Sequence, residues 1–481
     1  MNKISILFLM LMLISTSAVA KQSSFVDNSQ SVTVQPNRSS DVSTPIMPDS
    51  YDIEVDGLYY KITSISDLTV ALVGGEGVYS GSIEIPSELE YRGKKLKVTS
   101  IGDRAFYNSD VTNVTIGGNV KRIGKYAFSK SSISKIVIPS SVITLEEYSF
   151  DYCSQLVDVN FEDGTEVLEF CKESQYIPKY FLGCHIHKLY IGRTIHLSTD
   201  DAIFSDLSNT SEIEIGPYVE TLNAYLLKGA SKVSSLRIPD SVTYLEEGAF
   251  DGCISLKSVI FEDGTNTLLY ATSGGYDSAV FEDSPLNYVY IGRNFRKKYS
   301  SVFSVFNHTP ITQIDISCVV TELDELSHLD KLKEINIPSS VTKILGSGFY
   351  GCDNLSRIVC NSTVPPTFET YREGFSNSVF ANGILYVPTG CVKAYEDAKV
   401  WGNFFDIQEF SSSGINEVSN VGKENHADVF YDANGVRHKN LIKGLNITKT
   451  KNGIVKKNIC KITQVRFLCM PTAYTVSGHH L

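Results

Sequence analysis

Two pairs of neighbouring glutamates, Glu146-Glu147 and Glu246-Glu247, are the acidic side chains whose spacing first suggests acid–base chemistry. Glycoside hydrolysis uses two carboxylates on opposite sides of one sugar-binding cleft, several ångström apart. Glutamates that are adjacent in the chain do not create this geometry. Because both pairs occupy the same position of a repeated segment, we interpret them as solvated repeat residues and not as catalytic acids.

A second acidic motif, FEDGT, occupies residues 161–165 and returns at residues 261–265. At the corresponding place in a third copy of the surrounding segment stands Cys360, without the acidic residues. Phenylalanine suits the end of a buried strand, and Asp-Gly favours a turn. We therefore predict that FEDGT ends a strand and begins a turn, and that it is not catalytic.

Histidines are candidate metal ligands, and the chain contains 9 of them. His185 and His187 could face one side of an extended segment, with His196 close by in the sequence. No HExxH motif and no Cys, His and Asp set with established metal-ligand spacing accompanies them. Nucleophile-elbow and phosphate-loop motifs are also missing from the sequence. We predict no catalytic residue, no cofactor site and no metal site.

Internal repetition dominates the sequence and decides how these residues are interpreted. Residues 138–165 and 238–265 are identical at 17 of 28 aligned positions, and a third copy begins at Ile337. A shorter period of mostly 22–25 residues separates large apolar residues inside these copies. They are Phe106, Phe128, Phe150, Phe181, Phe204, Leu227, Phe250, Phe281, Phe306, Leu326, Phe349 and Phe380. A period of this length is typical of a solenoid, in which each coil packs against its neighbours.

Short strands are predicted between these landmarks. The pattern apolar-x-x-apolar-x-apolar recurs, for example at Ile133, Ile136 and Ile138. The last two apolar residues are two positions apart, so they share one face of a strand. One such strand cannot bury its apolar face alone, but about twelve stacked coils bury it in a continuous core.

The repeated motifs resemble the leucine-rich repeat of the BspA type. They are IPSSV (138–142), IGDRAF (101–106), IGKYAF (123–128) and GAFDGC (248–253). The resemblance covers roughly residues 81–410 and implies a mainly β fold, a right-handed solenoid with a concave parallel sheet. The family is typical of secreted and surface proteins of Gram-negative gut and oral bacteria. It implies roles in adhesion, although a solenoid scaffold does not fix one function.

The segments around the repeats predict the domain organisation. Lys3, the apolar run after it and Ala18-Val19-Ala20 are typical of a signal peptide, so we expect a secreted or outer-cell-surface protein. The predicted order is a signal peptide (1–20), a flexible linker (21–50), an N-terminal β cap (51–80), the leucine-rich-repeat solenoid (81–390), a C-terminal cap (391–410), a linker (411–427), a small C-terminal β module (428–460) and an unassigned tail (461–481).

The two C-terminal segments carry specific expectations. Val392, Tyr395 and Trp401 recur near helical spacing, which predicts a capping helix over 391–404 with Trp401 packed on the last coil. The β module resembles modules on exported proteins of the same bacteria, where they act in export or surface attachment.

Charge argues against a nucleic-acid partner, and hydropathy argues against a transmembrane segment. Lys and Arg number 43 against 54 Asp and Glu, giving a net charge of −11. Nucleic-acid binding needs basic patches, so we expect no nucleic-acid partner. No segment beyond the signal peptide is apolar for long enough to span a membrane, so we predict no transmembrane segment in the mature chain.

Outward-facing strand residues are the predicted binding surface. Four tyrosines fall at such positions, and exposed tyrosine is enriched in recognition surfaces. The candidate partner-binding residues are Tyr190, Tyr288, Tyr290 and Tyr386, together with His187 and Arg237. Three enlarged coils, with loops at 162–180, 262–280 and 361–379, offer a second candidate surface.

Two cysteines should lie next to each other in the stack. Cys153 and Cys184 each follow a landmark phenylalanine by three residues in successive coils. Their Cα atoms should therefore fall within disulfide range. A disulfide and a pair of stacked, buried thiols are both compatible with this placement.

These observations favour a non-enzymatic secreted or cell-surface binding protein. Its partner would be a host or bacterial surface protein recognised through the repeat scaffold. The alternatives are a glycan-binding module and a polysaccharide-active β-solenoid enzyme. The enzyme would need acids and bases clustered on neighbouring outward positions, whereas the predicted outward positions carry isolated charges.

Overall fold

The computed structural model of the 481-residue chain describes most of the predicted repeat region. The described residues are 48, 50–171, 180–197, 203–204, 207–271, 280–281, 284–298, 304–307, 309–370, 373–410 and four strands within 429–460. The predicted signal peptide (1–20), nearly all of the first linker, the linker at 411–427 and the tail (461–481) lie outside them.

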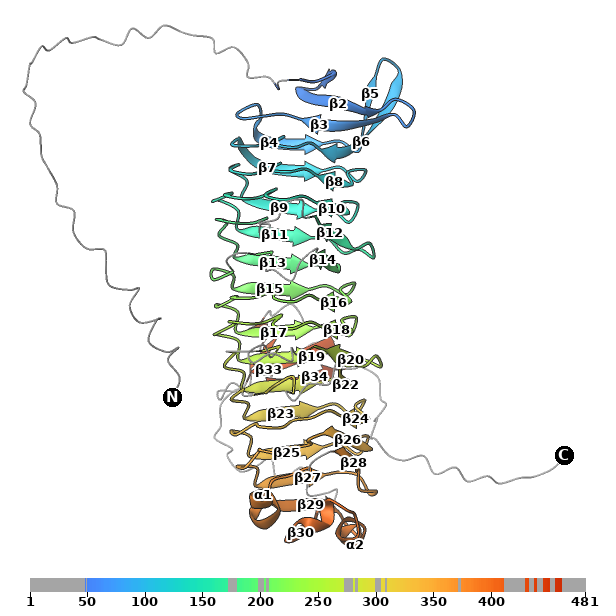
Figure 1. Ribbon diagram of the computed structural model, residues 1–481, viewed down its shortest axis with the longest axis vertical. Helices are drawn as coiled ribbons and strands as arrows, with labels where there is room; N and C mark the ends of the chain where they lie inside the picture. Colours follow the sequence, from blue (N-terminus) through green and yellow to red (C-terminus); the bar gives the residue numbers. More distant parts are fainter. Residues whose placement is uncertain are drawn as a thin grey trace, which may run out of the picture. The chain divides into compact units, whose positions relative to one another are not determined.

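One face of the coils carries short strands, which pair in parallel and form four successive sheets along the stack. These strands are β4 (Ser80–Ile85), β7 (Asp110–Ile116), β9 (Lys135–Ile138), β11 (Asp158–Phe161), β13 (Lys188–Ile191), β15 (Glu212–Ile215), β17 (Ser235–Ile238), β19 (Ser258–Phe261), β21 (Tyr288–Ile291), β23 (Gln313–Ile316), β25 (Glu334–Ile337), β27 (Arg357–Cys360), β29 (Ile384–Pro388) and β30 (Asp406–Phe410). Figure 1 shows them one below another, and we call this face the strand face.

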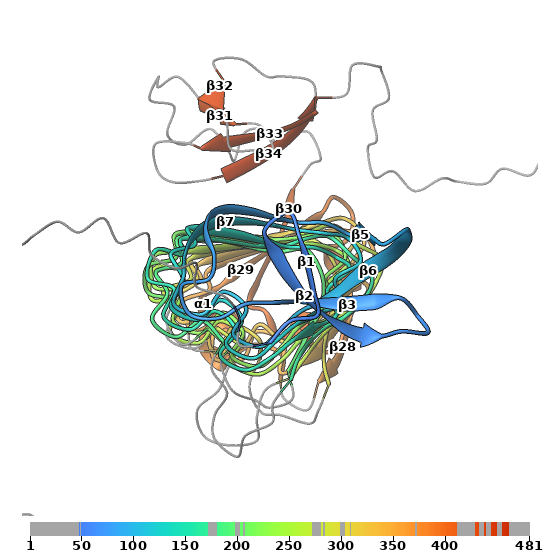
Figure 2. The ribbon, with the colours of Figure 1, turned by 90° about the horizontal axis from the view of Figure 1, so that it is seen from above.

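A second face of the coils carries strands that, after the first, are only two to four residues long; they pair in parallel from coil to coil within three successive sheets. They are β6 (Lys94–Ile101), β8 (Arg122–Ile123), β10 (Thr144–Leu145), β12 (Leu168–Phe170), β14 (Ile195–Leu197), β16 (Thr221–Leu222), β18 (Tyr244–Leu245), β20 (Leu268–Tyr270), β22 (Phe295–Lys297), β24 (Glu322–Leu323), β26 (Lys343–Gly346) and β28 (Thr367–Thr370). The predicted mainly β solenoid is confirmed, and viewed along the stack its coils superpose (Figure 2).

A third side, which we call the turn side, carries the landmark phenylalanines. Phe106, Phe128 and Phe150 are fully buried and stack on one another with ring centroids 4.9 and 5.0 Å apart. The backbone N–H of each of these residues donates to a carbonyl of the next coil, for example Phe128 to Ser149 at 2.7 Å. Ring stacking and backbone hydrogen bonds therefore join successive coils on this side as the sheets do on the others.

The strand face follows the predicted inward and outward alternation. In β13, Leu189 and Ile191 are buried while Lys188 is exposed and Tyr190 is half-buried. The register aligns Ile191 with Phe161 of β11. Phe161, the first residue of FEDGT, is fully buried. FEDGT begins at the end of a strand, as predicted, and a bend follows at Thr165 and Glu166; its lack of a catalytic role stays a prediction.

The N-terminal end of the solenoid is antiparallel. Strands β1 (Ile53–Val55), β2 (Leu58–Ser64) and β3 (Thr69–Val73) form a meander, and β3 then pairs in parallel with β6. Strand β5 (Glu88–Tyr91) forms a hairpin with β6. The meander lies within the region of the predicted N-terminal β cap (51–80), whereas the β5–β6 hairpin lies beyond it.

The C-terminal end differs from the single helix expected over 391–404. Helix α2 spans Val392–Glu396, a short 3₁₀ helix spans Trp401–Asn403, and β30 then adds a last strand to the strand face. The prediction of one helix over this whole range is wrong, since α2 ends at Glu396 and the chain then passes so close to it that a Cβ on Gly402 would clash with the Glu396 carbonyl oxygen. Trp401 is buried as expected, and its Nε1–H donates to the carbonyl of Pro366 at 2.8 Å.

Two further elements complete the description. Helix α1 (Asn377–Asn382) carries Phe380 into the core, but the ring that stacks on Phe349 is Phe375, at 5.1 Å. In the predicted C-terminal module, β31 (Val429–Tyr431), β32 (Arg437–His438), β33 (Gly444–Lys449) and β34 (Val455–Cys460) form an antiparallel sheet. No helix in the described part of the chain is long and apolar enough to cross a membrane.

Candidate partner-binding faces

The predicted tyrosines lie on the strand face, at two separate heights of the stack. Tyr190 of β13 stands between Asn160 and Glu214 of its neighbouring strands. Tyr288 and Tyr290 both belong to β21, which lies four strands further along the face. With strands about 4.8 Å apart, the two heights are on the order of 19 Å apart.

Two of these phenols are held by the aspartate of FEDGT. The hydroxyl of Tyr190 donates to Asp163 Oδ1 at 2.6 Å, and that of Tyr290 donates to Asp263 Oδ1 at 2.7 Å. Each donor stands 27 residues after its acceptor, in the following coil. This equal spacing is the sequence signal that would have revealed the second role of FEDGT.

Tyr288 is held from the opposite direction. Its hydroxyl donates to Asp315 Oδ2 of β23 at 3.0 Å, and Gln313 donates to the same carboxylate at 3.3 Å. Burial, followed by the charge of Asp315, raises the pKa of Tyr288 above its usual value. Burial and the hydrogen bond with Asp263 raise the pKa of Tyr290 to about 12. Both phenols are therefore neutral donors at physiological pH, with restricted orientations.

The other three candidate residues lie apart from the pair on β21. Arg237 is exposed to 42% and forms an ion pair with Glu262 of the next coil. His187 is exposed beside the start of β13. Tyr386 of β29 lies under the guanidinium of Arg357, which is 4.7 Å from the ring centroid. The structure thus brings Tyr288 and Tyr290 together, and distributes Tyr190, His187, Arg237 and Tyr386 along the same face.

Two buried arginines behind this face were not predicted from the sequence pattern. Arg193 is fully buried, and its guanidinium donates to the carbonyls of Pro139, Ser140 and Val142 at 2.7–2.9 Å. Arg293, also fully buried, repeats the arrangement one hundred residues later. Burial lowers the pKa of both guanidiniums to about 10, so both remain charged at neutral pH.

The interpretation of the glutamate pairs as solvated residues is wrong for the first pair. Glu147 is only 1% exposed, and its carboxylate lies 3.0 Å from Lys125 Nζ. Glu146 accepts two hydrogen bonds from Arg122 at 2.6 and 2.7 Å. In the second pair, Glu246 accepts from the backbone N–H of Ala224. These carboxylates join successive coils, a role that composition and spacing alone do not reveal.

Cys153 and Cys184 are buried, and both are free thiols in the structure. Cys153 donates to the carbonyl of Phe128 at 2.9 Å, and Cys184 to that of Phe150 at 3.1 Å. The hydrogen bond with Cys153, followed by burial, raises the pKa of the Cys184 thiol. The two residues therefore lie together as the repeat predicts, in the stacked-thiol arrangement; the disulfide stays a prediction.

The histidines considered as metal ligands do not converge. His185 Nδ1 lies 3.1 Å from the carbonyl of Ser154, and His196 Nδ1 lies 2.5 Å from Glu169 Oε2. Among the residues that the structure describes, no group of three His, Cys, Asp or Glu side chains is placed to hold a metal ion.

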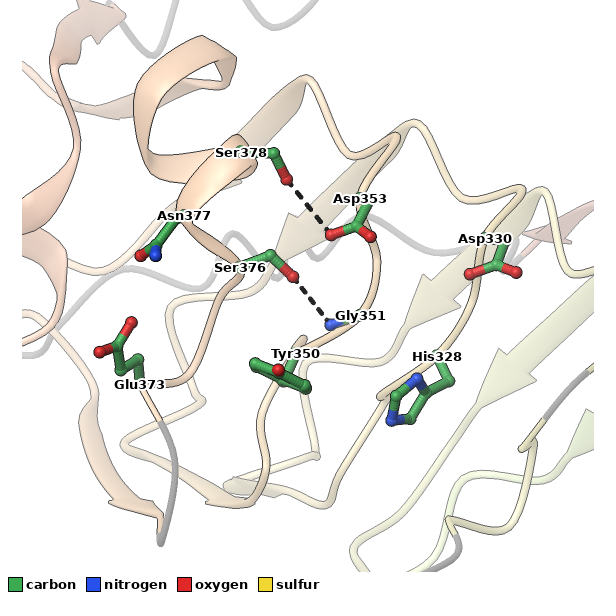
Figure 3. Close-up of a pocket in the computed structure, with 9 residues that line it drawn as sticks. All are labelled: His328, Asp330, Tyr350, Gly351, Asp353, Glu373, Ser376, Asn377 and Ser378. Carbon is green, nitrogen blue, oxygen red and sulfur yellow. Dashed lines mark hydrogen bonds between the residues drawn. The ribbon is translucent and has the colours of Figure 1, made fainter.

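The third enlarged coil contributes to a pocket of about 680 Å³ on the turn side (Figure 3). Asp330, Asp353 and Glu373 line it, together with the edge-to-face rings of His328 and Tyr350, whose centroids are 5.9 Å apart. Carboxylates accept hydrogen bonds and attract cations, so this lining suits hydroxyl-rich or cationic groups. In the first two enlarged coils, residues 172–179 and 272–279 lie outside the described part of the chain.

Comparison with protein families identifies the repeat. The model of the BspA type leucine rich repeat region, spanning six copies, matches residues 84–195, 175–305 and 276–379. The chain belongs to the BspA-type leucine-rich repeat family. The resemblance stated from the motifs is therefore confirmed, and the stacked parallel strands are the BspA-type fold. Comparison with curated proteins gave no match.

Solved structures of bacterial leucine-rich repeat proteins are similar to this BspA-type chain. A leucine-rich cell surface protein from Faecalibacterium prausnitzii A2-165 is 18% identical, with 78% of this chain and 98% of that chain covered and a TM-score of 0.31. A leucine-rich repeat protein from Bacteroides ovatus ATCC 8483 is 19% identical, with 75% and 100% covered and a TM-score of 0.27. The pneumococcal vaccine antigen PcpA is 14% identical, with 74% and 98% covered and a TM-score of 0.23.

Proposed function

We propose that this protein is a non-enzymatic binding protein, secreted or held at the outer cell surface, that recognises a protein partner through its strand face. Tyr288 and Tyr290 form the centre of the contact. The supporting observation is that both phenols are fixed by aspartates, Asp315 and Asp263, on a sheet that stacking already makes rigid. A preordered aromatic surface loses little conformational entropy on binding, which favours its use as a contact.

The carboxylates beside Tyr288 and Tyr290 are engaged with neighbours. Asp263 and Asp315 accept from these tyrosines, and Glu262 pairs with Arg237. A general acid or base must be free to exchange a proton with a substrate. A binding role therefore accounts for the held tyrosines and carboxylates of this face more simply than a polysaccharide-degrading activity does.

The test is to screen the protein against arrays of host and bacterial surface proteins and of glycans, and then to compare variants on each partner found. The Tyr288→Ala/Tyr290→Ala double variant should lose binding to a protein partner. Tyr218→Ala removes an exposed ring (47% exposed) elsewhere and is the matched control. If the protein binds only glycans, and the same double variant loses this binding, the partner of the strand face is a glycan and not a protein.

A further inference from the structure

In the turns around Phe106, Phe128, Phe150, Leu227 and Phe250, the residues two before and two after the core residue adopt a left-handed backbone. Around Phe128 they are Tyr126, with φ of 56°, and Lys130, with φ of 61°. This conformation directs their N–H groups to the next coil, where they donate to the carbonyls of Glu147 and Asp151. These turns thus use positive φ at both positions, a conformation that glycine adopts without steric cost.

The chain itself shows that glycine is sufficient at these positions. Later in the chain, Gly248 and Gly252 stand two residues before and after Phe250, and Gly351 stands two residues after Phe349, all with positive φ. The first three coils instead carry bulky side chains. They are Arg104 and Asn108, Tyr126 and Lys130, and Tyr148 and Tyr152, with φ between 47° and 61°. A bulky residue at positive φ costs on the order of 1–3 kcal/mol, whereas asparagine adopts this conformation readily, so the backbone explains Asn108 but not the other five side chains.

The bulky side chains build one continuous surface. The rings of Tyr126 and Tyr148 are stacked, with centroids 4.9 Å apart and planes within 7°. The guanidinium of Arg104 lies 5.4 Å from the Tyr126 centroid and 5.3 Å from that of Tyr107. Lys130 covers Tyr107 from 5.5 Å. We call these five residues the cation–aromatic row.

The row presents positive charge in an otherwise acidic protein. Arg104 and Lys130 are exposed, and neither forms an ion pair with another residue that the structure describes. Contact with aromatic faces fixes where both cations lie while leaving their charge accessible. The net charge of the chain is −11, so the row stands out as a local cationic surface.

We propose that the cation–aromatic row binds an acidic polysaccharide. The cations match carboxylate or sulfate groups, and the phenols of Tyr107, Tyr126 and Tyr148 between them match the hydroxyl groups of sugars. The row runs along the stack, so a linear polymer can follow it. A densely charged polyphosphate is disfavoured by the overall negative charge, and an acidic peptide offers few hydroxyls to the phenols.

The test uses three probes: polygalacturonate, dextran sulfate and uncharged dextran. The full-length protein should bind at least one of the two anionic polymers and not the neutral one, and which of them it binds distinguishes carboxylate from sulfate recognition. Binding should weaken as salt is raised, because exposed charges carry it. Affinity electrophoresis measures all three interactions in one format.

Glycine substitutions separate binding from folding. Arg104→Gly and Tyr126→Gly place at these positions the residue that later coils already use, so the melting temperature should stay the same or rise. Binding to the anionic polymer should weaken at least tenfold in each variant. Arg92→Gly is the charge-matched control, since Arg92 also has positive φ (50°) and lies over a tyrosine, but in the β5–β6 hairpin.

A second control addresses the ring. Tyr225 occupies the same turn position as Tyr126, with φ of 55°, but Lys228 over its ring is paired with Asp251. Tyr225→Gly should leave polymer binding unchanged. The proposal fails if neither anionic polymer binds, if neutral dextran binds equally, or if the controls lose as much affinity as Arg104→Gly. Because Tyr288 and Tyr290 lie on the strand face, the binding proposed there can fail or succeed independently.

Discussion

Asp163 accepts a 2.6 Å hydrogen bond from Tyr190, and Asp263 accepts a 2.7 Å bond from Tyr290 in the equivalent coils one hundred residues later. The acidic residues of the repeated motif therefore orient an aromatic residue of the following coil. This conserves geometry between the two modules although the residues around the tyrosines differ: Asn160 precedes Tyr190 in the sheet, and Ile260 precedes Tyr290.

Truncation of the two tyrosines on β21 should strongly weaken the binding of a protein partner. We expect Tyr288→Ala/Tyr290→Ala to cost 2 kcal/mol or more, about 30-fold in Kd, because buried aromatic anchors dominate interfaces. Calorimetry or surface plasmon resonance measures the change. Tyr218→Ala should cost less than about 0.5 kcal/mol. If Tyr218→Ala had the larger effect, the binding face would be misassigned.

Removal of a buried guanidinium should destabilise two coils at once. Arg193→Met keeps much of the side-chain volume but leaves the carbonyls of Pro139, Ser140 and Val142 without their donors, at about 3 kcal/mol in total. Urea unfolding measures the loss. Arg296→Met removes an exposed arginine that forms a surface ion pair with Glu322, so it should cost about 0.5 kcal/mol. If both variants lowered the free energy of unfolding equally, Arg193 would not have the stabilising role assigned to it.

Loss of a stacked ring should act locally. Phe250 stacks on Phe281 at 4.9 Å, and Phe250→Ala should cost about 3–5 kcal/mol. Since coils contact only their neighbours, hydrogen-exchange protection should fall in the coils around β19 and remain in the first three coils. A uniform loss of protection along the whole solenoid would show that the coils unfold as one unit.

Alkaline pH should weaken the fold through its tyrosines. The pKa of Tyr290 is about 12 in the folded protein, against an ordinary value of 10.0, so the folded state holds its proton more tightly than the unfolded state. The stability that this provides is complete below about pH 10 and disappears as pH rises towards 12. Urea midpoints measured from pH 8 to 12 should therefore decrease, and Tyr290→Phe should decrease less steeply.

The two stacked cysteines should be free. Both thiols donate to carbonyls of the preceding coil, so we expect Cys153 and Cys184 to react with an alkylating reagent only after unfolding, without prior reduction. Peptide mass spectrometry identifies the labelled residues. A crosslinked peptide containing both cysteines would instead establish the disulfide that their placement also permits.

The sequence predicted those features that repeat with a fixed period. The stacked phenylalanines, the inward strand residues and the outward tyrosines all follow from side-chain alternation and coil length, which are local properties. Contacts that skip a coil were not predictable in this way. Arg193 reaches carbonyls more than fifty positions earlier, and the charge of an arginine gives no local sign that it is buried.

The capping helix and the glutamate pair show the same limit. Val392, Tyr395 and Trp401 are near helical spacing, yet the indole reaches the carbonyl of Pro366 only because the chain leaves the helix. Glu147 is buried because Lys125 of the preceding coil is available to it. In both cases a tertiary partner determines the outcome, and the local pattern contains no information about that partner.

The separation between Tyr190 and the tyrosines of β21 makes the strand face a molecular ruler. Four strand spacings, about 19 Å, separate two equivalent Asp–Tyr pairs, and the stacked core keeps that distance constant. A partner with two matching epitopes at this interval would engage the second one intramolecularly, at a high effective concentration. Two weak contacts would then combine into avidity. This protein would therefore bind a partner with repeated epitopes far more tightly than a partner with a single epitope.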